Sequence, residues 1–241
     1  MAHIGTSGWS YDHWAGVLYP PGTPVARRLQ VYTDAFRTVE LNASFYRWPP
    51  QRNFTGWRER LPEGFLMSVK APRGLTHARR LAEPEAWAER IAHRWRALGP
   101  RAGMLLAQLH PAHERDDARL DAFLGALHPG IPVAVELRHP SWHVEEVFRL
   151  LERRGASYCV MSGARLPCVL RATARRVYVR FHGPDDEHLY AGSYSDDDLR
   201  WWADRMREWS DGGHDVLAYF NNDGDGNAVR NARTLRWILG A

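Results

Sequence analysis

Residues 132–161, PVAVELRHPSWHVEEVFRLLERRGASYCVM, contain one complete copy of the pattern that decides the fold. Pro132–Glu136 is a short apolar run typical of a buried strand, and Val144–Arg154 has the spacing of an amphipathic helix. Gly155 ends that helix, and Ser157–Met161 is the next apolar run. The stretch therefore predicts a strand, a helix and a second strand in succession.

The same alternation continues along the rest of the chain. Further strands are expected at His3–Thr6, Thr38–Leu41, Phe65–Val69, Gly103–Ala107, Val177–Phe181 and Val216–Phe220. Further helices are clearest at Pro84–Ala97, Asp116–Leu127, Asp196–Trp209 and Asn227–Leu239. About eight strand-then-helix units favour the α/β class, as a (β/α)8 TIM-like barrel, over an open doubly wound sheet, which usually has fewer strands.

One unit of this barrel is irregular. Between strands six and seven, the stretch from Ser162 to Arg176 is too short for a full helix and contains the breakers Gly163 and Pro167. No linker or low-complexity segment divides the chain, so we expect one domain spanning residues 1–241.

Composition limits the class of protein. No stretch reaches the length of a membrane span, and the N-terminus enters a strand without a signal peptide. Cys159 and Cys168 form neither a disulfide framework nor a metal-binding spacing. We therefore expect a cytoplasmic, reduced protein with no membrane partner. The sequence does not set its oligomeric state.

The charge balance is basic but mixed. The pI is about 9.3, yet the formal charge is only +4. Arginines such as Arg90 and Arg94 alternate with Glu85 and Glu89, which is typical of a solvated helix surface. A nucleic-acid partner is therefore left open but is not favoured.

Lys70 is the only lysine of the chain, beside 31 arginines. Arginine can replace lysine on a solvated surface, but not where a compact charge or an amine that loses its proton is needed. Lys70 ends the apolar run Phe65–Val69, so we expect it to point into a pocket. The alternative is that its survival is an accident of composition.

Polar residues lie at the carboxyl end of nearly every predicted strand, which is where the chemistry of such barrels takes place. They are Glu40, Asn42, Lys70, Gln108, Glu136, Arg138, Ser162, Arg180, His182, Asn221 and Asn222. Pairs two residues apart, such as Glu136 and Arg138, project to the same side of a strand. A purely structural barrel would not need this set.

Each member also has a structural explanation. Glu40 and Arg138 could each be half of a buried salt-bridge network that only holds the strand ends together. His182 could be a satisfied turn histidine, and Gln108 a brace for the backbone. The functional interpretation therefore depends on their convergence at one end of the barrel.

The strand-end segments also carry a family pattern. They are Gly5-Thr6-Ser7-Gly8-Trp9, Val39-Glu40-Leu41-Asn42-Ala43-Ser44-Phe45-Tyr46, Val69-Lys70-Ala71-Pro72-Arg73 with Thr76-His77, Gln108-Leu109, Glu136-Leu137-Arg138-His139-Pro140-Ser141-Trp142, Arg180-Phe181-His182-Gly183 and Asn221-Asn222-Asp223. In this order they resemble the YecE-like family, a domain of unknown function. The resemblance implies a TIM-barrel-like fold with a polar pocket at the strand carboxyl ends, without implying a reaction. Three positions depart from the pattern, namely Ser162 in place of aspartate, Ser44 where threonine is commoner, and His110.

We expect an enzyme that acts on a small anionic molecule bearing phosphate or carboxylate, with Arg138 and Arg180 as the anion clamp. The expected groups for proton transfer or nucleophilic attack are Lys70, Glu40, Glu136 and His182. The expected substrate-binding residues are Asn42, Tyr46, His77, Gln108, Arg138, Arg180, Asn221, Asn222, Trp9 and Trp142. No metal or other cofactor is expected, because one histidine beside three cations makes a poor metal cage.

Two alternatives stay open. The first is a metal-assisted phosphodiesterase resembling barrel endonucleases of DNA repair, although such enzymes generally use several histidine ligands. The second is a non-catalytic binding protein that keeps the pocket without the chemistry.

Overall fold

The computed structural model describes residues 1–163 and 165–240 of the chain. Its strands are β1 (Ala2–Thr6), β2 (Thr38–Leu41), β3 (Leu66–Lys70), β4 (Ala102–Gln108), β5 (Val133–Glu136), β6 (Ser157–Ser162), β7 (Arg176–Phe181) and β8 (Asp215–Phe220). Its α-helices are α1 (Val25–Ala35), α2 (Ala43–Tyr46), α3 (Gln51–Arg60), α4 (Glu85–Leu98), α5 (Asp117–Ala126), α6 (Glu145–Arg154), α7 (Asp196–Asp211) and α8 (Asn227–Leu239).

The strands follow the hydrogen-bonded order β1-β8-β7-β6-β5-β4-β3-β2. The pairings of β1 with β8, β8 with β7, β3 with β4, β4 with β5 and β5 with β6 are parallel. This sequential order of parallel strands with intervening helices is the (β/α)8 fold of the TIM-barrel type, which confirms the predicted fold class. The predicted strands are all present, with ends that differ by at most one residue.

The irregular unit is also where the sequence predicts it. Between β6 and β7, none of the residues that the structure describes is helical. Conversely, α1, α2 and α3 are additional to the helices that periodicity predicts most clearly. Helix α3 buries only Phe54, so its sequence lacks the apolar stripe that marks a core-facing helix.

The chain forms two compact units. The first consists of Met1–Glu40, Val160–Leu170 and Arg175–Ala241, and the second of Leu41–Cys159 and Arg171–Ala174. The first unit thus contains β1, β7 and β8, and the second contains β3, β4 and β5. The chain passes from one unit to the other once within β2, once within β6 and twice between β6 and β7. That residues 1–241 act as a single domain stays a prediction.

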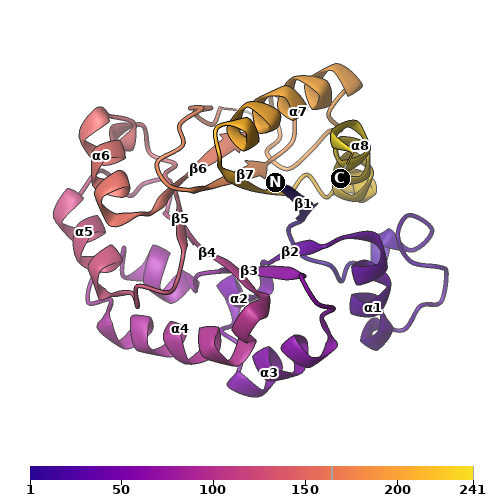
Figure 1. Cartoon of the computed structure of the whole chain (residues 1–241), viewed down its shortest axis with the longest axis horizontal. Helices are drawn as coiled ribbons and strands as arrows, with labels where there is room; N and C mark the ends of the chain where they lie inside the picture. Colours follow the sequence, from indigo (N-terminus) through magenta and orange to yellow (C-terminus); the bar gives the residue numbers. More distant parts are fainter. Residues whose placement is uncertain (164, 241) are drawn as a thin grey trace. The chain divides into compact units, whose positions relative to one another are not determined.

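In the first unit, α7 and α8 cover the strands. Helix α8 packs on β1 and β8, and α7 packs on β8 and α8 (Figure 1). Ser195 and Asp198 form a reciprocal capping box at the start of α7, as the sequence predicts for an N-cap followed by acidic residues. At Gly5 of β1, an added Cβ atom would lie 2.2 Å from the Thr38 carbonyl oxygen, so the close approach of these two segments requires glycine.

In the second unit, α3 to α6 lie along the outer side of the strands (Figure 1). Helix α6 shows why the sequence folds in this way. It buries Val147, Phe148, Leu150 and Leu151 on one side and ends at Gly155, whose φ of 62° is left-handed.

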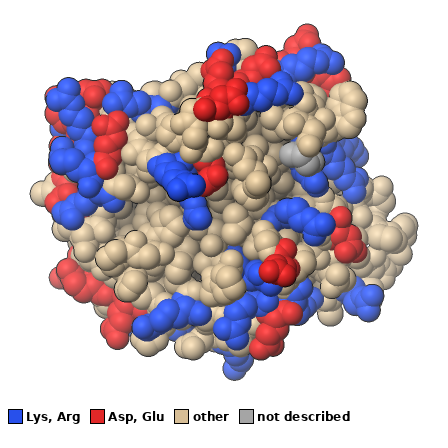
Figure 2. All heavy atoms as spheres, in the orientation of Figure 1, with Lys and Arg blue, Asp and Glu red and all other residues tan. Residues whose placement is uncertain are grey.

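Charged residues of both signs are interspersed on the molecular face shown in Figure 2. Helix α7 also carries ion pairs between neighbouring turns, such as Arg200 with Asp197 and Arg207 with Asp204. None of the helices in the described part of the chain is long and apolar enough to cross a membrane.

Candidate functional site

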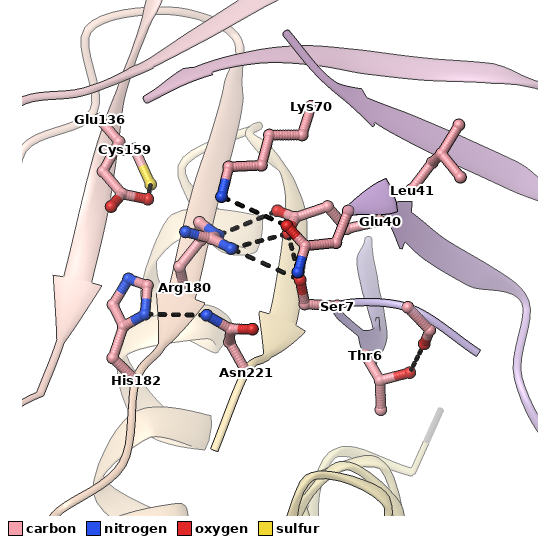
Figure 3. Close-up of polar contacts among 12 residues, drawn as sticks. Thr6, Ser7, Glu40, Leu41, Lys70, Glu136, Cys159, Arg180, His182 and Asn221 are labelled. Carbon is pink, nitrogen blue, oxygen red and sulfur yellow. Dashed lines mark hydrogen bonds and ion pairs between the residues drawn. The ribbon is translucent and has the colours of Figure 1, made fainter. Parts of the chain in front are cut away.

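In the first unit, the carboxylate of Glu40 is the centre of a buried network. Glu40 and Arg180 are both 0% exposed. Arg180 donates from Nε to Glu40 Oε2 at 3.0 Å and from a terminal nitrogen to Oε1 at 2.8 Å (Figure 3). Ser7 donates to Oε1 at 2.6 Å, and Tyr178 donates to Oε2 at 2.8 Å. Together, these donors stabilise the ionised form of Glu40.

The tyrosine of this network stays protonated. Burial, followed by the negative charge of Glu40, raises the pKa of Tyr178 well above its ordinary value. Tyr178 is therefore a permanent donor at neutral pH. This arrangement is a buried ion pair with satisfied neighbours, which is the structural alternative that the sequence leaves open for Glu40. Arg180 likewise directs two of its nitrogens to Glu40 rather than into an open cavity.

His182 and Asn221 form a second contact in the first unit, at the ends of β7 and β8. Asn221 Nδ2 lies 3.3 Å from His182 Nδ1, and His182 is 0% exposed (Figure 3). Because an amide nitrogen only donates, Nδ1 accepts and the proton of a neutral His182 is on Nε2. The backbone nitrogen of Tyr190 also donates to the His182 carbonyl at 2.6 Å, which holds the following loop against the histidine.

The other two predicted binding residues of the first unit differ in burial. Asn222 is 0% exposed and donates to the Gly192 carbonyl at 3.0 Å and to Asn231 Oδ1 at 2.8 Å. It thereby ties the loop before α7 to α8. Trp9 is half-buried after β1.

In the second unit, Lys70 is the last residue of β3 and is only 7% exposed. It is not among the residues that line the cavity beside His77, so its projection into a pocket stays a prediction. Its Nζ donates to Asn42 Oδ1 at 3.2 Å (Figure 3). The ammonium also lies 4.4 Å from the centre of the Phe45 ring. Ser44 donates to the Lys70 carbonyl at 2.6 Å, so the hydroxyl that serine shares with threonine is in use at this position.

The register of β3, β4 and β5 brings three predicted residues to one face of the second unit. Lys70 is paired with Leu106 on β4. Gln108 is two residues further along β4 and is paired with Glu136 on β5. Side chains that are paired across strands, or two apart along a strand, point to the same face. Lys70, Gln108 and Glu136 therefore project to the same side.

Glu136 and Arg138 form an ion pair at the end of β5. Arg138 Nε lies 2.7 Å from Glu136 Oε1, and their side chains are 7% and 0% exposed respectively. The thiol of Cys159 donates to Glu136 Oε2 at 3.9 Å (Figure 3). The sequence predicts that Glu136 and Arg138 project to the same side of the strand. In the structure they are also in direct contact.

Gln108 has an unusual buried atom. The residue is 6% exposed, and its Oε1 has no hydrogen-bond partner among residues 1–163 and 165–240. A buried acceptor without a donor costs about 1–3 kcal/mol. This oxygen therefore suits a ligand that carries a hydroxyl or amine.

A cavity of about 480 Å³ lies beside this edge of the second unit. It is lined by Tyr46, Arg73, Gly74, His77, Ala78 and His110. Tyr46 is 76% exposed. The ring centre of His77 lies 4.8 Å from that of Phe45 and 5.1 Å from that of His110. Phe45 thus contacts both Lys70 and a histidine of the cavity.

The electrostatics of His77 show how cationic this region is. Burial lowers the pKa of His77 to about 4, and the charges of His110, Lys70, Arg73 and Arg138 act in the same direction. His77 is therefore neutral at pH 7. The Thr76 hydroxyl donates to the Pro72 carbonyl at 3.3 Å, so its oxygen accepts from His77 Nδ1 at 3.0 Å and leaves Nε2 with a lone pair.

Trp142, the remaining predicted residue, is fully buried in the second unit. Its indole nitrogen donates to the His113 carbonyl at 2.6 Å, and its ring packs edge-on against that of His113. It is not among the residues that line the cavity.

Sequence reasoning missed several residues that the structure brings to these groups. Ser7 and Tyr178 bind Glu40, and Phe45 contacts Lys70. Arg73 lines the cavity four residues before His77. That spacing in a helical turn is a signal that could have placed Arg73 beside His77.

Known proteins resemble the chain over its full length. The family model described as "Protein of unknown function DUF72" matches residues 3–241. The UPF0759 protein YunF of Bacillus subtilis (strain 168) is 30% identical over 270 residues, which cover 99% of this chain and 95% of that protein.

Two solved structures show the same fold. A DUF72 family protein from Thermotoga maritima MSB8 superposes with a TM-score of 0.89 at 28% identity, over 100% of both chains. A DUF72 family protein from Enterococcus faecalis V583 gives a TM-score of 0.85 at 19% identity, over 100% of this chain and 96% of that one. The second likeness shows the fold alone. From the family match and the YunF relative, we conclude that the chain belongs to the DUF72 family.

Proposed function

We propose that the protein is an enzyme that binds a small phosphate- or carboxylate-bearing metabolite at the carboxyl ends of β3, β4 and β5. The observation that carries the proposal is the positive charge around the neutral His77, to which Lys70, Arg73 and Arg138 all contribute. Such a region attracts anions and raises their local concentration. We also propose that the chain belongs to the YecE-like group, which is a narrower description of the family.

Lys70 is proposed to act as an ammonium ion. The carbonyl oxygen of Asn42 accepts a hydrogen bond from Nζ, and the face of Phe45 lies 4.4 Å away. Both contacts favour the charged form of lysine. A charged Lys70 binds an anion and can give a proton to it, whereas a Schiff base needs the neutral amine.

His77 is the proposed proton acceptor. It is uncharged at neutral pH, and its Nε2 carries the lone pair. Glu136 is proposed to act with Arg138 as an ion pair that orients the guanidinium toward the substrate. Gln108 is proposed to accept a hydrogen bond from a substrate hydroxyl or amine.

The first unit contains the other predicted site residues, and they are considered there by themselves. A role of these residues in substrate chemistry is proposed only because they lie at strand ends. They are Glu40, Arg180, His182, Asn221 and Asn222. The contacts of Glu40 and Arg180 with each other support a positioning role for this pair rather than proton transfer.

The metal-assisted alternative gains no support from the available donors. In the described part of the chain, no group of three or more His, Cys, Asp or Glu side chains could hold a metal ion. The binding-protein alternative differs from the proposal only in lacking turnover. Turnover is therefore the property to measure.

The proposal is tested by a thermal-shift screen of phosphorylated and carboxylated metabolites, followed by turnover assays of each compound that stabilises the protein. A ligand that binds only the folded state raises the melting temperature. We expect stabilisation of the wild type by a small anion, loss of this effect in Lys70→Met, and product formation by the wild type.

Arg96→Met is the matched control, because Arg96 is an exposed basic residue of α4 that does not line the cavity. The control should respond to the anion as the wild type does. Equal stabilisation of the wild type and Lys70→Met by every anion would contradict the site. Binding that depends on Lys70 without conversion of any ligand would support the binding-protein alternative instead.

A further inference from the structure

A second cavity of the same unit is lined mainly by the segment that follows β4. It has a volume of about 390 Å³ and is lined by Arg80, Ala112, His113, Glu114, Arg115, Asp116 and Arg119. None of these residues lines the cavity of His77. Three arginines face two carboxylates here, so the lining has an excess of positive charge.

His113 is the feature that distinguishes this cavity from an ordinary surface hollow. The residue is only 4% exposed, and neither of its ring nitrogens has a hydrogen-bond partner in the part of the chain that the structure describes. Buried polar groups are nearly always hydrogen-bonded, so each exception calls for an explanation, and a bound water or ion is one. Both ring nitrogens of His113 lack a hydrogen-bond partner in the described part of the chain.

The charges around His113 determine whether an anion or a cation is favoured beside it. Burial lowers the pKa of His113, and the charges of Arg80 and Arg119 lower it further, whereas Asp116 raises it. The imidazole is therefore neutral at pH 7, with one donor and one acceptor nitrogen. The field that acts on it comes mainly from cations, and such a field favours an anion.

The arginines of the lining differ in their availability. Arg115 is bound to Asp117 at 2.6 Å, and Arg119 is bound to Asp116 at 3.3 Å. Arg80 is exposed and has no ion-pair partner among the residues described. It is thus the cation of the lining that can bind a ligand without giving up a carboxylate.

We propose that this cavity is a binding site for a small oxyanion or a phosphate-bearing molecule, held by the guanidinium of Arg80 and the imidazole of His113. Arg119 contributes charge at its edge. The site is separate from the proposed catalytic region and goes beyond it. One turn connects the two regions, because His113 donates its backbone nitrogen to the His110 carbonyl at 2.8 Å and Ala112 donates to His110 Nδ1 at 3.0 Å.

Sulfate is the appropriate probe, because it carries no titrating proton near neutral pH. The protein would be labelled with ¹⁵N-histidine, and the ring signals of His113 would be identified by their loss in His113→Phe. Titration of the wild type with sulfate should shift these signals in a saturable way. In Arg80→Met, the affinity should be weaker by about tenfold or more, as for the loss of a charge-assisted hydrogen bond.

Arg79→Met is the matched control. Arg79 is the neighbouring arginine, but it is paired with Glu83 and does not line the cavity. It should keep the wild-type affinity, and both arginine variants should keep the wild-type melting temperature because Arg79 and Arg80 are exposed. A His113 signal that does not respond to sulfate overturns the proposal. So does an equal loss in Arg79→Met and Arg80→Met, which would indicate an adventitious ion only.

Discussion

Replacing Glu40 with glutamine removes the negative charge of the buried pair and keeps the size of the side chain. Arg180 is 0% exposed and would remain charged, because a guanidinium does not lose its proton in proteins. Its two donors to Glu40, at 3.0 and 2.8 Å, would then face a neutral amide. Removal of one partner of a buried ion pair costs about 3–5 kcal/mol. For a chain of 241 residues, a loss of this size lowers the melting temperature by roughly 6–20 °C.

Calorimetry and urea unfolding of the wild type and Glu40→Gln would measure this loss. The double variant Glu40→Leu with Arg180→Met is the control, because replacing both charges with apolar groups avoids the uncompensated cation and should recover most of the stability. Ser7→Ala removes only one hydrogen bond to the carboxylate, so its cost should be smaller, about 1.5–3 kcal/mol.

The reasoning would be refuted if Glu40→Gln melted within about 2 °C of the wild type, since a loss of 3–5 kcal/mol cannot produce so small a shift. If the same variant were stable and also failed to convert a substrate that the wild type converts, Glu40 would be a catalytic residue rather than half of a structural pair.

Three further predictions concern the second unit. Gln108→Leu should raise the free energy of unfolding by about 1–3 kcal/mol, because it removes a buried acceptor without a partner. The same variant should bind a hydroxylated anion more weakly. A lower stability of this variant in urea unfolding would indicate that Oε1 is hydrogen-bonded. Between pH 6.5 and about 4, the wild type should lose more stability than His77→Gln. The unfolded chain protonates His77 near its ordinary pKa of 6.5, whereas the folded protein holds that pKa at about 4, so parallel melting curves across this range would contradict the assignment. Borohydride treatment with small carbonyl metabolites should leave Lys70 unmodified by mass spectrometry, because its contacts favour the ammonium, whereas an adduct at Lys70 would establish Schiff-base chemistry.

The strands could be predicted because each is a short apolar run that ends at a polar residue or a turn. Lys70 illustrates this, since it ends β3 and is buried at the strand end as its position indicates. Helix α3 could not be predicted in the same way. It buries only Phe54, so tertiary packing rather than an apolar stripe determines it.

The candidate residues could be predicted, but their partners could not. Strand ends identify Glu40 and Arg180 as polar positions, yet these residues are 140 apart in the chain, and their contact depends on the arrangement of β2 and β7. The sequence therefore favoured Arg138 and Arg180 as two halves of one anion clamp. In the structure, Arg180 is paired with Glu40 and Arg138 with Glu136. Local spacing predicted that Glu136 and Arg138 project to the same side, because they are two apart at one strand end, and the structure adds their direct contact.

The central claim is that Lys70 belongs to an anion-binding site at the ends of β3, β4 and β5. The most direct test is an anomalous difference map from wild-type crystals soaked in selenate, compared with a map from Lys70→Met crystals soaked in the same way. The claim predicts a selenium peak within contact distance of Lys70 Nζ in the wild type and no peak there in Lys70→Met. An absence of selenate beside Lys70 in the wild type, or an unchanged peak in Lys70→Met, would contradict it.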